Sequence, residues 1–233
     1  MAGVLRSRIS CRGIFRMENS RLPLPHQRHY EQAYGLAYRL AAEELNRRDI
    51  SKLCDMSGAR YLEGGAPMAI ALTYLNRSYR ITLPDVDITP AGSQEPLSIR
   101  ENVLILHYLT LARRTPAAGR AITFKELPEG PVYFPTFAKR TLDPLLARFG
   151  KVPDRMLDAA EKMGGRRADY GDTAVAIQAF PFVAITPVLW RGDTEFAPSA
   201  SIIFDSGITD YLSTEDITVL CETVVWKLIK SLS

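Results

Sequence analysis

Cysteine is scarce in this sequence. The 233 residues contain three cysteines, Cys11, Cys54 and Cys221, which lie far apart and form no CxxC pair. Disulfide-stapled domains and cysteine-held metal clusters need several closely spaced cysteines, so the sequence predicts neither. A chain of this length with 46% apolar residues can bury a full hydrophobic core without such devices. Free thiols persist in a reducing compartment, and we therefore expect a cytoplasmic protein.

Long hydrophobic runs are also missing. The longest uninterrupted apolar stretches, such as residues 68–72 and 103–106, are far shorter than the roughly 20 residues that cross a bilayer as a helix. The first 16 residues are rich in arginine and lack the continuous apolar segment of a secretory signal. The sequence therefore predicts no membrane partner and no secretion.

The basic net charge comes from the N-terminal segment. The formal net charge is +3, and it becomes −1 when four arginines are left out, namely Arg6, Arg8, Arg12 and Arg16. The remainder is near neutral, whereas nucleic-acid-binding proteins usually carry a basic surface on the folded domain itself. We therefore expect no nucleic-acid partner.

Met17 marks an expected boundary. It begins a run that is typical of a natural protein start, so residues 1–16 have two interpretations: the product of an upstream start codon, or an Arg-rich organellar transit peptide. We expect residues 1–27 to form a disordered extension. No internal repeat or low-complexity linker interrupts residues 28–233, which are predicted to form a single globular domain.

Strand patterns occur in two groups. They predict an N-terminal hairpin at 68–75 and 78–83, turning at Asn76 and Arg77, and a C-terminal three-strand meander at 174–180, 182–190 and 201–204. Pro187 cannot donate a ladder hydrogen bond, so its strand is expected at a sheet edge or at a bulge.

Helical patterns fill the middle and the end of the chain. We expect about five helices, including one at 29–48, one opened by a capping box at Ser98, one at 134–149 that Pro144 kinks or shortens, one at 153–163, and a C-terminal helix capped by Ser213. Two groups of strands around a helical middle predict an α+β fold, in which an antiparallel sheet packs with these helices.

Familiar catalytic motifs are absent. The sequence has no glycine-rich phosphate loop between a strand and a helix, no GxSxG elbow and no HExxH pair, and it contains three histidines. These absences disfavour a nucleotide-binding fold and the common hydrolase classes. They also lead us to predict no metal site built from protein side chains alone.

His107 is the first candidate site residue. It lies in the most apolar helical segment, residues 104–109, where an imidazole needs a hydrogen bond or a ligand. One interpretation is a buried histidine with a satisfied hydrogen bond. The other is a functional residue, either an axial ligand to a metal tetrapyrrole or a general acid or base. The neighbouring Tyr108 is predicted to contact a cofactor together with His107.

Asp205 is the second candidate. Several acids crowd into the last strands and the start of the final helix, but most have local explanations: Glu215 and Asp216 complement a helix N-terminus, and Asp193 belongs to a turn. Asp205 has no such local role, so we predict that it pairs with His107 as acid and base if the protein is an enzyme.

Two further groups have alternative interpretations. Tyr30, Tyr34 and Tyr38 recur every fourth residue, which fits either packing in the core or stacking on a flat ligand. Lys139 and Arg140 could contact an anion or lie on a solvated helix face.

A series of motifs resembles a prokaryotic family catalogued as domain of unknown function 3786. The motifs are Pro96-Leu97, Ile105-Leu106-His107-Tyr108-Leu109, Lys139-Arg140, Asp143-Pro144, Gly171-Asp172, Phe180-Pro181, Trp190-Arg191-Gly192-Asp193, Glu195-Phe196, Phe204-Asp205 and Tyr211-Leu212-Ser213-Thr214-Glu215-Asp216. The resemblance implies an origin in bacteria or archaea, many of them anaerobic, and no established activity. Some relatives resemble fusions to a cysteine-rich iron–sulfur segment, whose cysteines this chain lacks.

Three functional hypotheses follow. The leading one is an accessory, non-catalytic domain that binds a small molecule, such as a metal tetrapyrrole, between the helical middle and the C-terminal sheet. The second is an enzyme that uses His107 and Asp205 in one cleft. The third is a module that binds a protein partner through the Pro187 edge strand or through the exposed side of the tyrosine helix.

Overall fold

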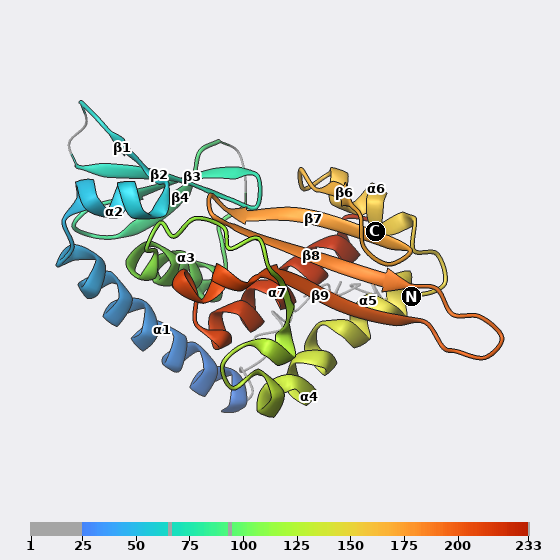
Figure 1. Ribbon diagram of the computed structural model, residues 1–233. Helices are drawn as coiled ribbons and strands as arrows, with labels where there is room; N and C mark the ends of the chain where they lie inside the picture. The colour runs from blue at the N-terminus through green and yellow to red at the C-terminus, as the bar shows by residue number, and fades with distance from the viewer. Residues whose placement is uncertain (1–24, 65–66, 93–94, 233) are drawn as a thin grey trace, which may run out of the picture.

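Two antiparallel sheets and a set of helices form the molecule (Figure 1). The computed structural model describes residues 25–64, 67–92 and 95–232, without the side chains before residue 32. The predicted extension at 1–27 therefore lies outside the described residues, apart from 25–27. The α+β class that the sequence predicts is confirmed.

The described helices and strands follow one another in a simple order. The helices are α1 (Pro25–Asn46), α2 (Ile50–Ser57), α3 (Ile99–Leu111), α4 (Gly130–Arg140), α5 (Leu142–Phe149), α6 (Arg155–Glu161) and α7 (Thr214–Lys230), with short 3-10 helices η1 (Phe124–Glu126) and η2 (Ser206–Asp210). The strands are β1 (Arg60–Leu62), β2 (Ala69–Tyr74), β3 (Arg77–Thr82), β4 (Asp87–Pro90), β5 (Ala121–Thr123), β6 (Arg166–Ala168), β7 (Thr173–Phe180), β8 (Val183–Trp190) and β9 (Ser199–Asp205).

Both sheets are larger than the sequence predicts. The N-terminal hairpin is the centre of a four-stranded sheet in the order β1-β2-β3-β4, and the meander is the centre of a five-stranded sheet in the order β5-β9-β8-β7-β6. The added strands have three or four residues, too few to give a clear period-two pattern. The hairpin turns at Leu75 and Asn76, one residue earlier than predicted, because both have the positive φ (47° and 60°) that a two-residue hairpin loop requires.

The prediction that Pro187 lies on an edge strand is wrong. Strand β8 lies between β7 and β9, and Pro187 pairs with Ile202 of β9. On the other side, β7 and β8 pair at Ala174 with Val188 and resume at Ile177 with Ile185, so the ladder is interrupted opposite the proline. The missing N–H is therefore tolerated at an interruption of an internal ladder. A protein partner cannot add a strand at this position.

The long helix predicted at 134–149 is divided into α4 and α5. The break lies at Thr141, and Pro144 occupies the first turn of α5, where its missing N–H leaves no helical hydrogen bond unmade. The predicted shortening is confirmed. The helix also begins earlier than predicted, at Gly130, because Pro131 is accepted in the first turn of a helix.

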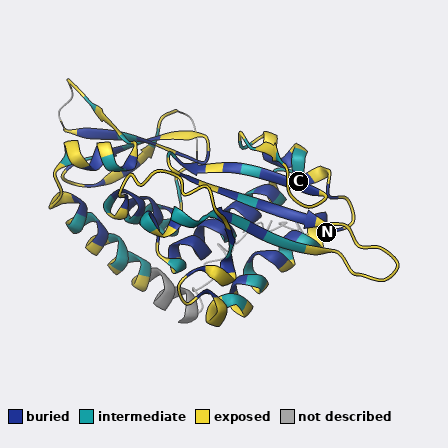
Figure 2. Ribbon diagram, viewed as in Figure 1, coloured by how far each residue is buried: buried dark blue, intermediate teal, exposed yellow. Residues whose placement is uncertain are grey.

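Helix α7 forms the centre of the core. It packs against α3, α5 and α6, and Figure 2 shows it buried together with β7 and β8, whereas α1 exposes much of its surface. Aromatic rings link the two sheets through this core. The Tyr108 ring stacks on the Phe180 ring with the ring centroids 4.1 Å apart, and the Phe180 ring centroid lies 4.9 Å from that of Tyr74. In the described part of the chain, no helix has the length and hydropathy of a membrane span.

Candidate functional site

A carboxylate from a distant helix holds the imidazole of His107. His107 lies near the end of α3, Asp216 lies in the first turn of α7, and the two helices pack side by side (Figure 1). His107 Nδ1 is 2.8 Å from Asp216 Oδ1, across 109 residues of sequence. The His107 side chain is 35% exposed and the Asp216 side chain 10%. The pair therefore lies at the surface with its carboxylate on the inner side.

The other partners of Asp216 fix the tautomer of the imidazole. Asp216 Oδ2 accepts hydrogen bonds from the Ser213 hydroxyl (2.6 Å) and the Ser213 amide (3.3 Å), which form the capping box of α7. A carboxylate surrounded by donors only accepts, so Nδ1 of His107 carries the shared hydrogen. In the neutral imidazole, the lone pair is then on Nε2.

The same contact changes the basicity of His107. The hydrogen bond with Asp216 raises the pKa of His107 above its ordinary value, against the opposing effect of burial, and the charges of Asp216 and Glu215 act in the same direction as the hydrogen bond. A more basic imidazole is a better metal ligand and a better proton acceptor.

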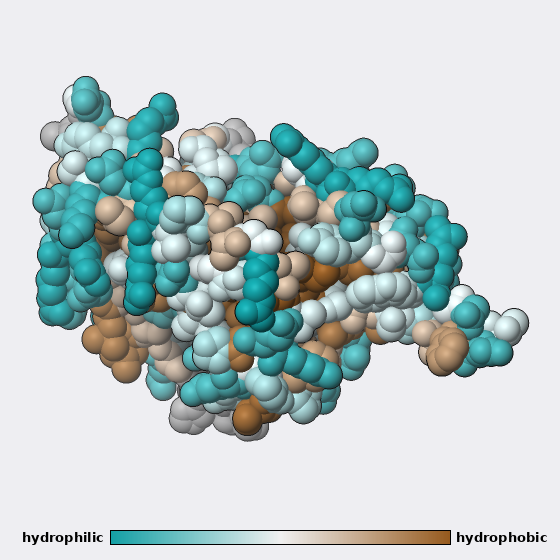
Figure 3. Space-filling model, viewed as in Figure 1, coloured by the Kyte–Doolittle hydropathy of each residue, from teal (hydrophilic) through white to brown (hydrophobic). Residues whose placement is uncertain are grey.

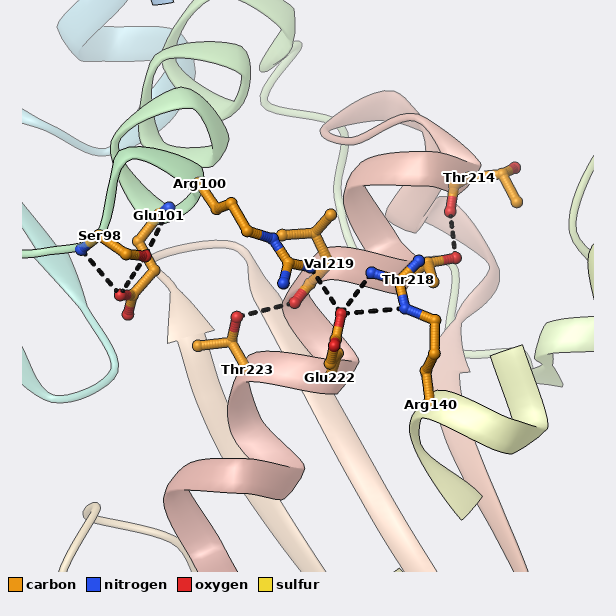
Figure 4. A network of polar contacts seen from close by, with 9 residues as sticks. All are labelled: Ser98, Arg100, Glu101, Arg140, Thr214, Thr218, Val219, Glu222 and Thr223. Carbon is orange, nitrogen blue, oxygen red and sulfur yellow. Dashed lines mark hydrogen bonds and ion pairs between the residues drawn. The ribbon is translucent and has the colours of Figure 1, made fainter. Parts of the chain in front are cut away.

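A second polar cluster lies further along the same two helices. Glu222 of α7 is placed between Arg100 of α3 and Arg140 of α4 (Figure 4). Its Oε2 atom accepts from Arg100 Nη2 at 2.5 Å and from Arg140 Nε at 3.1 Å, and it also contacts Arg140 Nη2. Burial would raise the pKa of Glu222, but the two guanidinium groups lower it. The cluster therefore holds three helices together with one carboxylate.

These contacts form a row between antiparallel helices. Arg100 and His107 are seven residues apart on α3, which places them on one face about 10 Å apart along the axis. A third pair, Glu101 with Lys227 Nζ at 3.0 Å, joins the start of α3 to the end of α7. We call this surface, defined by His107, Asp216 and the Arg100–Glu222–Arg140 cluster, the α3–α7 face.

Asp205 lies in a different environment. It lines a cavity of about 470 Å³ between the loop 113–120, the turn from β7 to β8, and η2. Its carboxylate accepts hydrogen bonds from the amides of Gly207 (2.8 Å), Ala118 (3.0 Å) and Gly119 (2.8 Å). Burial acts to raise the pKa of Asp205, but these three amides together lower it. We call this space the loop cavity.

The structure thus separates the three residues predicted from the sequence. The partner of His107 is Asp216, whereas Asp205 is bonded to backbone amides of the loop cavity. Tyr108 is fully buried, its hydroxyl donates to the Ser57 carbonyl oxygen at 2.7 Å, and burial raises its pKa. Its ring contacts the core instead of the α3–α7 face.

The sequence does not reveal several of these contacts. The local pattern explains Asp216 only as a complement to the helix terminus, although a capping box engages one carboxylate oxygen and leaves the other for a distant donor. The sequence leaves open a solvated helix face for Arg140, but its guanidinium donates to the Glu222 carboxylate. Of the three tyrosines, Tyr38 donates to the Val86 carbonyl oxygen and Tyr34 lies 5.9 Å from the Arg100 guanidinium, while the Tyr30 side chain lies outside the described residues.

Comparison with protein families assigns the chain. A family model described as a domain of unknown function, DUF3786, matches residues 49–227. The chain belongs to this family. The matched region contains both the α3–α7 face and the loop cavity and begins after α1. Searches of curated proteins and of solved structures gave no match.

Proposed function

We propose that this DUF3786 chain is an accessory, non-catalytic domain that binds a small molecule through Nε2 of His107. The observation that carries the proposal is the 2.8 Å hydrogen bond between His107 Nδ1 and Asp216. A carboxylate that fixes one imidazole nitrogen, and so presents the other nitrogen to a ligand, is the usual arrangement around metal-bound histidines.

The chemistry of the surrounding residues narrows the ligand class. Within the described residues, no group of three or more histidine, cysteine, aspartate or glutamate side chains is arranged to hold a metal ion. A single imidazole would therefore hold a metal that brings most of its own ligands. A metal tetrapyrrole, such as haem or a corrinoid, fits this requirement, and His107 would serve as its axial ligand.

Exposed apolar side chains on α3 and at the start of α4 support contact with a large flat ligand. Leu111 follows His107 by one helical turn and is 44% exposed. The first turn of α4 exposes Val132 and Tyr133, and the hydrogen bond from Thr214 Oγ1 to the Pro128 carbonyl oxygen (2.8 Å) ties the segment before it to the start of α7.

An absorbance titration tests the proposal. The purified full-length protein is titrated anaerobically with haem and, separately, with hydroxocobalamin, and the Soret or corrinoid bands are followed. We expect saturable spectral shifts that are lost in His107→Ala and weakened in Asp216→Asn. His29→Ala, which removes an imidazole outside the matched region, serves as the control and should bind as the wild type does. Identical spectra for wild type and His107→Ala would exclude the proposed axial ligand.

A further inference from the structure

The loop cavity is a second site, independent of His107, and we propose that it binds a small organic ammonium ion with an apolar or aromatic body. His107 does not belong to the described lining of this cavity. Its volume of about 470 Å³ lies in the range of small-molecule sites. Figure 3 shows weakly polar and hydrophobic residues over much of the middle of this face of the molecule, crossed by a few strongly hydrophilic side chains.

The wall of the cavity is fixed before any ligand binds. The loop 113–120 has no regular secondary structure, but Asp205 accepts hydrogen bonds from two of its amides. The Tyr211 hydroxyl donates to the Thr115 carbonyl oxygen at 2.6 Å, and the Arg120 carbonyl oxygen accepts from the Ser206 amide at 2.9 Å. A loop held at both ends and in the middle loses little entropy when a ligand binds.

Three polar side chains on the described lining, those of Gln178, Asp205 and Tyr211, offer hydrogen-bond acceptors, whereas Arg114 and Thr115 can donate. Gln178 Nε2 donates to the carbonyl oxygens of Phe180 (2.7 Å) and Pro181 (3.3 Å), which leaves Gln178 Oε1 as an acceptor. The two Asp205 oxygens offer about four lone-pair sites, of which three accept from amides. The Tyr211 oxygen has already used its hydrogen. A ligand that bonds to Gln178, Asp205 and Tyr211 must donate hydrogen bonds.

Charge and aromatic rings favour a cation over a neutral donor. The Asp205 carboxylate carries a full negative charge when ionised, and its three amide bonds favour that form. Phe182 is 41% exposed, and its ring centroid lies 6.0 Å from that of Tyr211. Its ring can contact an ammonium group by a cation–π interaction. Arg114 also lies on the described lining, and its positive charge opposes that of a bound cation. Its Nη1 atom donates to the Asp55 carbonyl oxygen at 3.2 Å.

Three indoles that differ in one group test the assignment. Tryptamine, tryptophol and indole-3-propionate share a ring system but are cationic, neutral and anionic at neutral pH. Binding to the full-length protein is measured by titration calorimetry, with the backbone amide NMR signals of Gly119 and Gly207 as local reporters. We expect tryptamine to bind at least about tenfold more tightly than the other two, as charge-assisted hydrogen bonds imply.

Variants place the binding in the loop cavity. Ala184 is an exposed strand residue on the lining, so Ala184→Arg adds a like charge without disturbing the core and should weaken tryptamine binding at least about tenfold. Phe182→Leu removes the π face and should weaken it about two- to fivefold. Ala147→Arg on the exposed side of α5 is the charge control and should bind as the wild type does.

Each contrary result removes a defined part of the proposal. Equal affinities for the three indoles would exclude selection for a cation, and full binding by Ala184→Arg would exclude this location. If no indole binds at millimolar concentrations, the site as a whole is excluded. Because none of these variants touches His107, the outcome is separate from that of the tetrapyrrole titration.

Discussion

The α3–α7 face and the loop cavity each depend on one carboxylate near the start of a helix, but the two carboxylates hold different groups. Asp216 accepts from the imidazole of His107, a side chain that can titrate and bind ligands. Asp205 accepts from three backbone amides, which cannot titrate. A carboxylate bonded to side chains sets their protonation and orientation, whereas a carboxylate bonded to amides sets the path of the chain.

This difference also distinguishes the energetics of the two regions. The charges of the α3–α7 face are partly buried and pair with one another, so loss of one member leaves an uncompensated charge between helices. The loop cavity loses hydrogen-bond acceptors when Asp205 changes, and the affected amides can turn toward water. We therefore expect changes on the α3–α7 face to lower the global stability more than changes in the cavity, whose effect is concentrated on the loop 113–120.

The largest effect is expected for Glu222→Gln. This substitution leaves the guanidinium groups of Arg100 and Arg140 without their shared carboxylate, and we expect the free energy of unfolding to fall by about 2 to 3 kcal/mol, somewhat below a fully buried pair because solvent reaches Arg140. Urea denaturation measures the change.

The matched control for that prediction is Glu43→Gln on α1. Glu43 pairs with Arg47, and both side chains are mostly exposed. We therefore expect the free energy of unfolding to fall by less than about 0.5 kcal/mol. Equal losses for the two variants would show that the cluster on the α3–α7 face does not hold the helices together.

A smaller effect is expected for Asp205→Asn. The asparagine amide keeps one acceptor but places a donor against backbone N–H groups. We therefore expect the free energy of unfolding to fall by about 1 to 2 kcal/mol. Hydrogen exchange should become faster at Ala118 and Gly119, while the titration of His107 followed by NMR stays unchanged. A shifted His107 titration in this variant would contradict the separation of the two regions.

The serine caps of α3 and α7 should contribute about equally to stability. Ser213→Ala removes the capping hydroxyl of α7, and Ser98→Ala removes that of α3, so each should lower the free energy of unfolding by about 1 kcal/mol. Ser213 also donates to Asp216, so thermal or chemical denaturation should be combined with NMR of His107. Only Ser213→Ala should change the His107 titration.

Local signals explain how much of this arrangement could be predicted. The sequence predicts the capping residues Ser98 and Ser213 because each contacts a residue three positions away. The bond between His107 and Asp216 spans 109 residues and depends on which helices pack together, which no local pattern encodes. The local pattern therefore assigns the acids in the first turn of α7 to the helix dipole alone.

Local sequence patterns do not determine the strand order either. Pro187 lacks an N–H, and the sequence indicates only that one ladder hydrogen bond is missing there. An edge position and an interrupted internal ladder meet this condition equally well, and the structure has the second. Asp205 illustrates the same limit, because its amide partners Ala118 and Gly119 are more than 80 residues away, at separations of 87 and 86.

The smallest expected effect is the pH dependence of the stability that the His107–Asp216 pair contributes. It tests most directly whether Asp216 and Asp205 act differently. The folded-state pKa of His107 is raised above its unfolded value, mainly by the hydrogen bond with Asp216. The protonated form is thus favoured by folding, so the stabilisation is fully present below the unfolded pKa of about 6.5 and is lost as the pH rises through the folded pKa.

Urea denaturation of wild type and Asp216→Asn across this range measures the effect. The stability difference between the two proteins should be larger at the acidic end and shrink as the pH rises, and NMR should give a lower His107 pKa in Asp216→Asn. Asp205→Asn provides the contrast, since its stability loss should stay constant over the same pH range. A constant difference for Asp216→Asn as well would mean that Asp216 acts on the chain only as a cap, as Asp205 does on its loop.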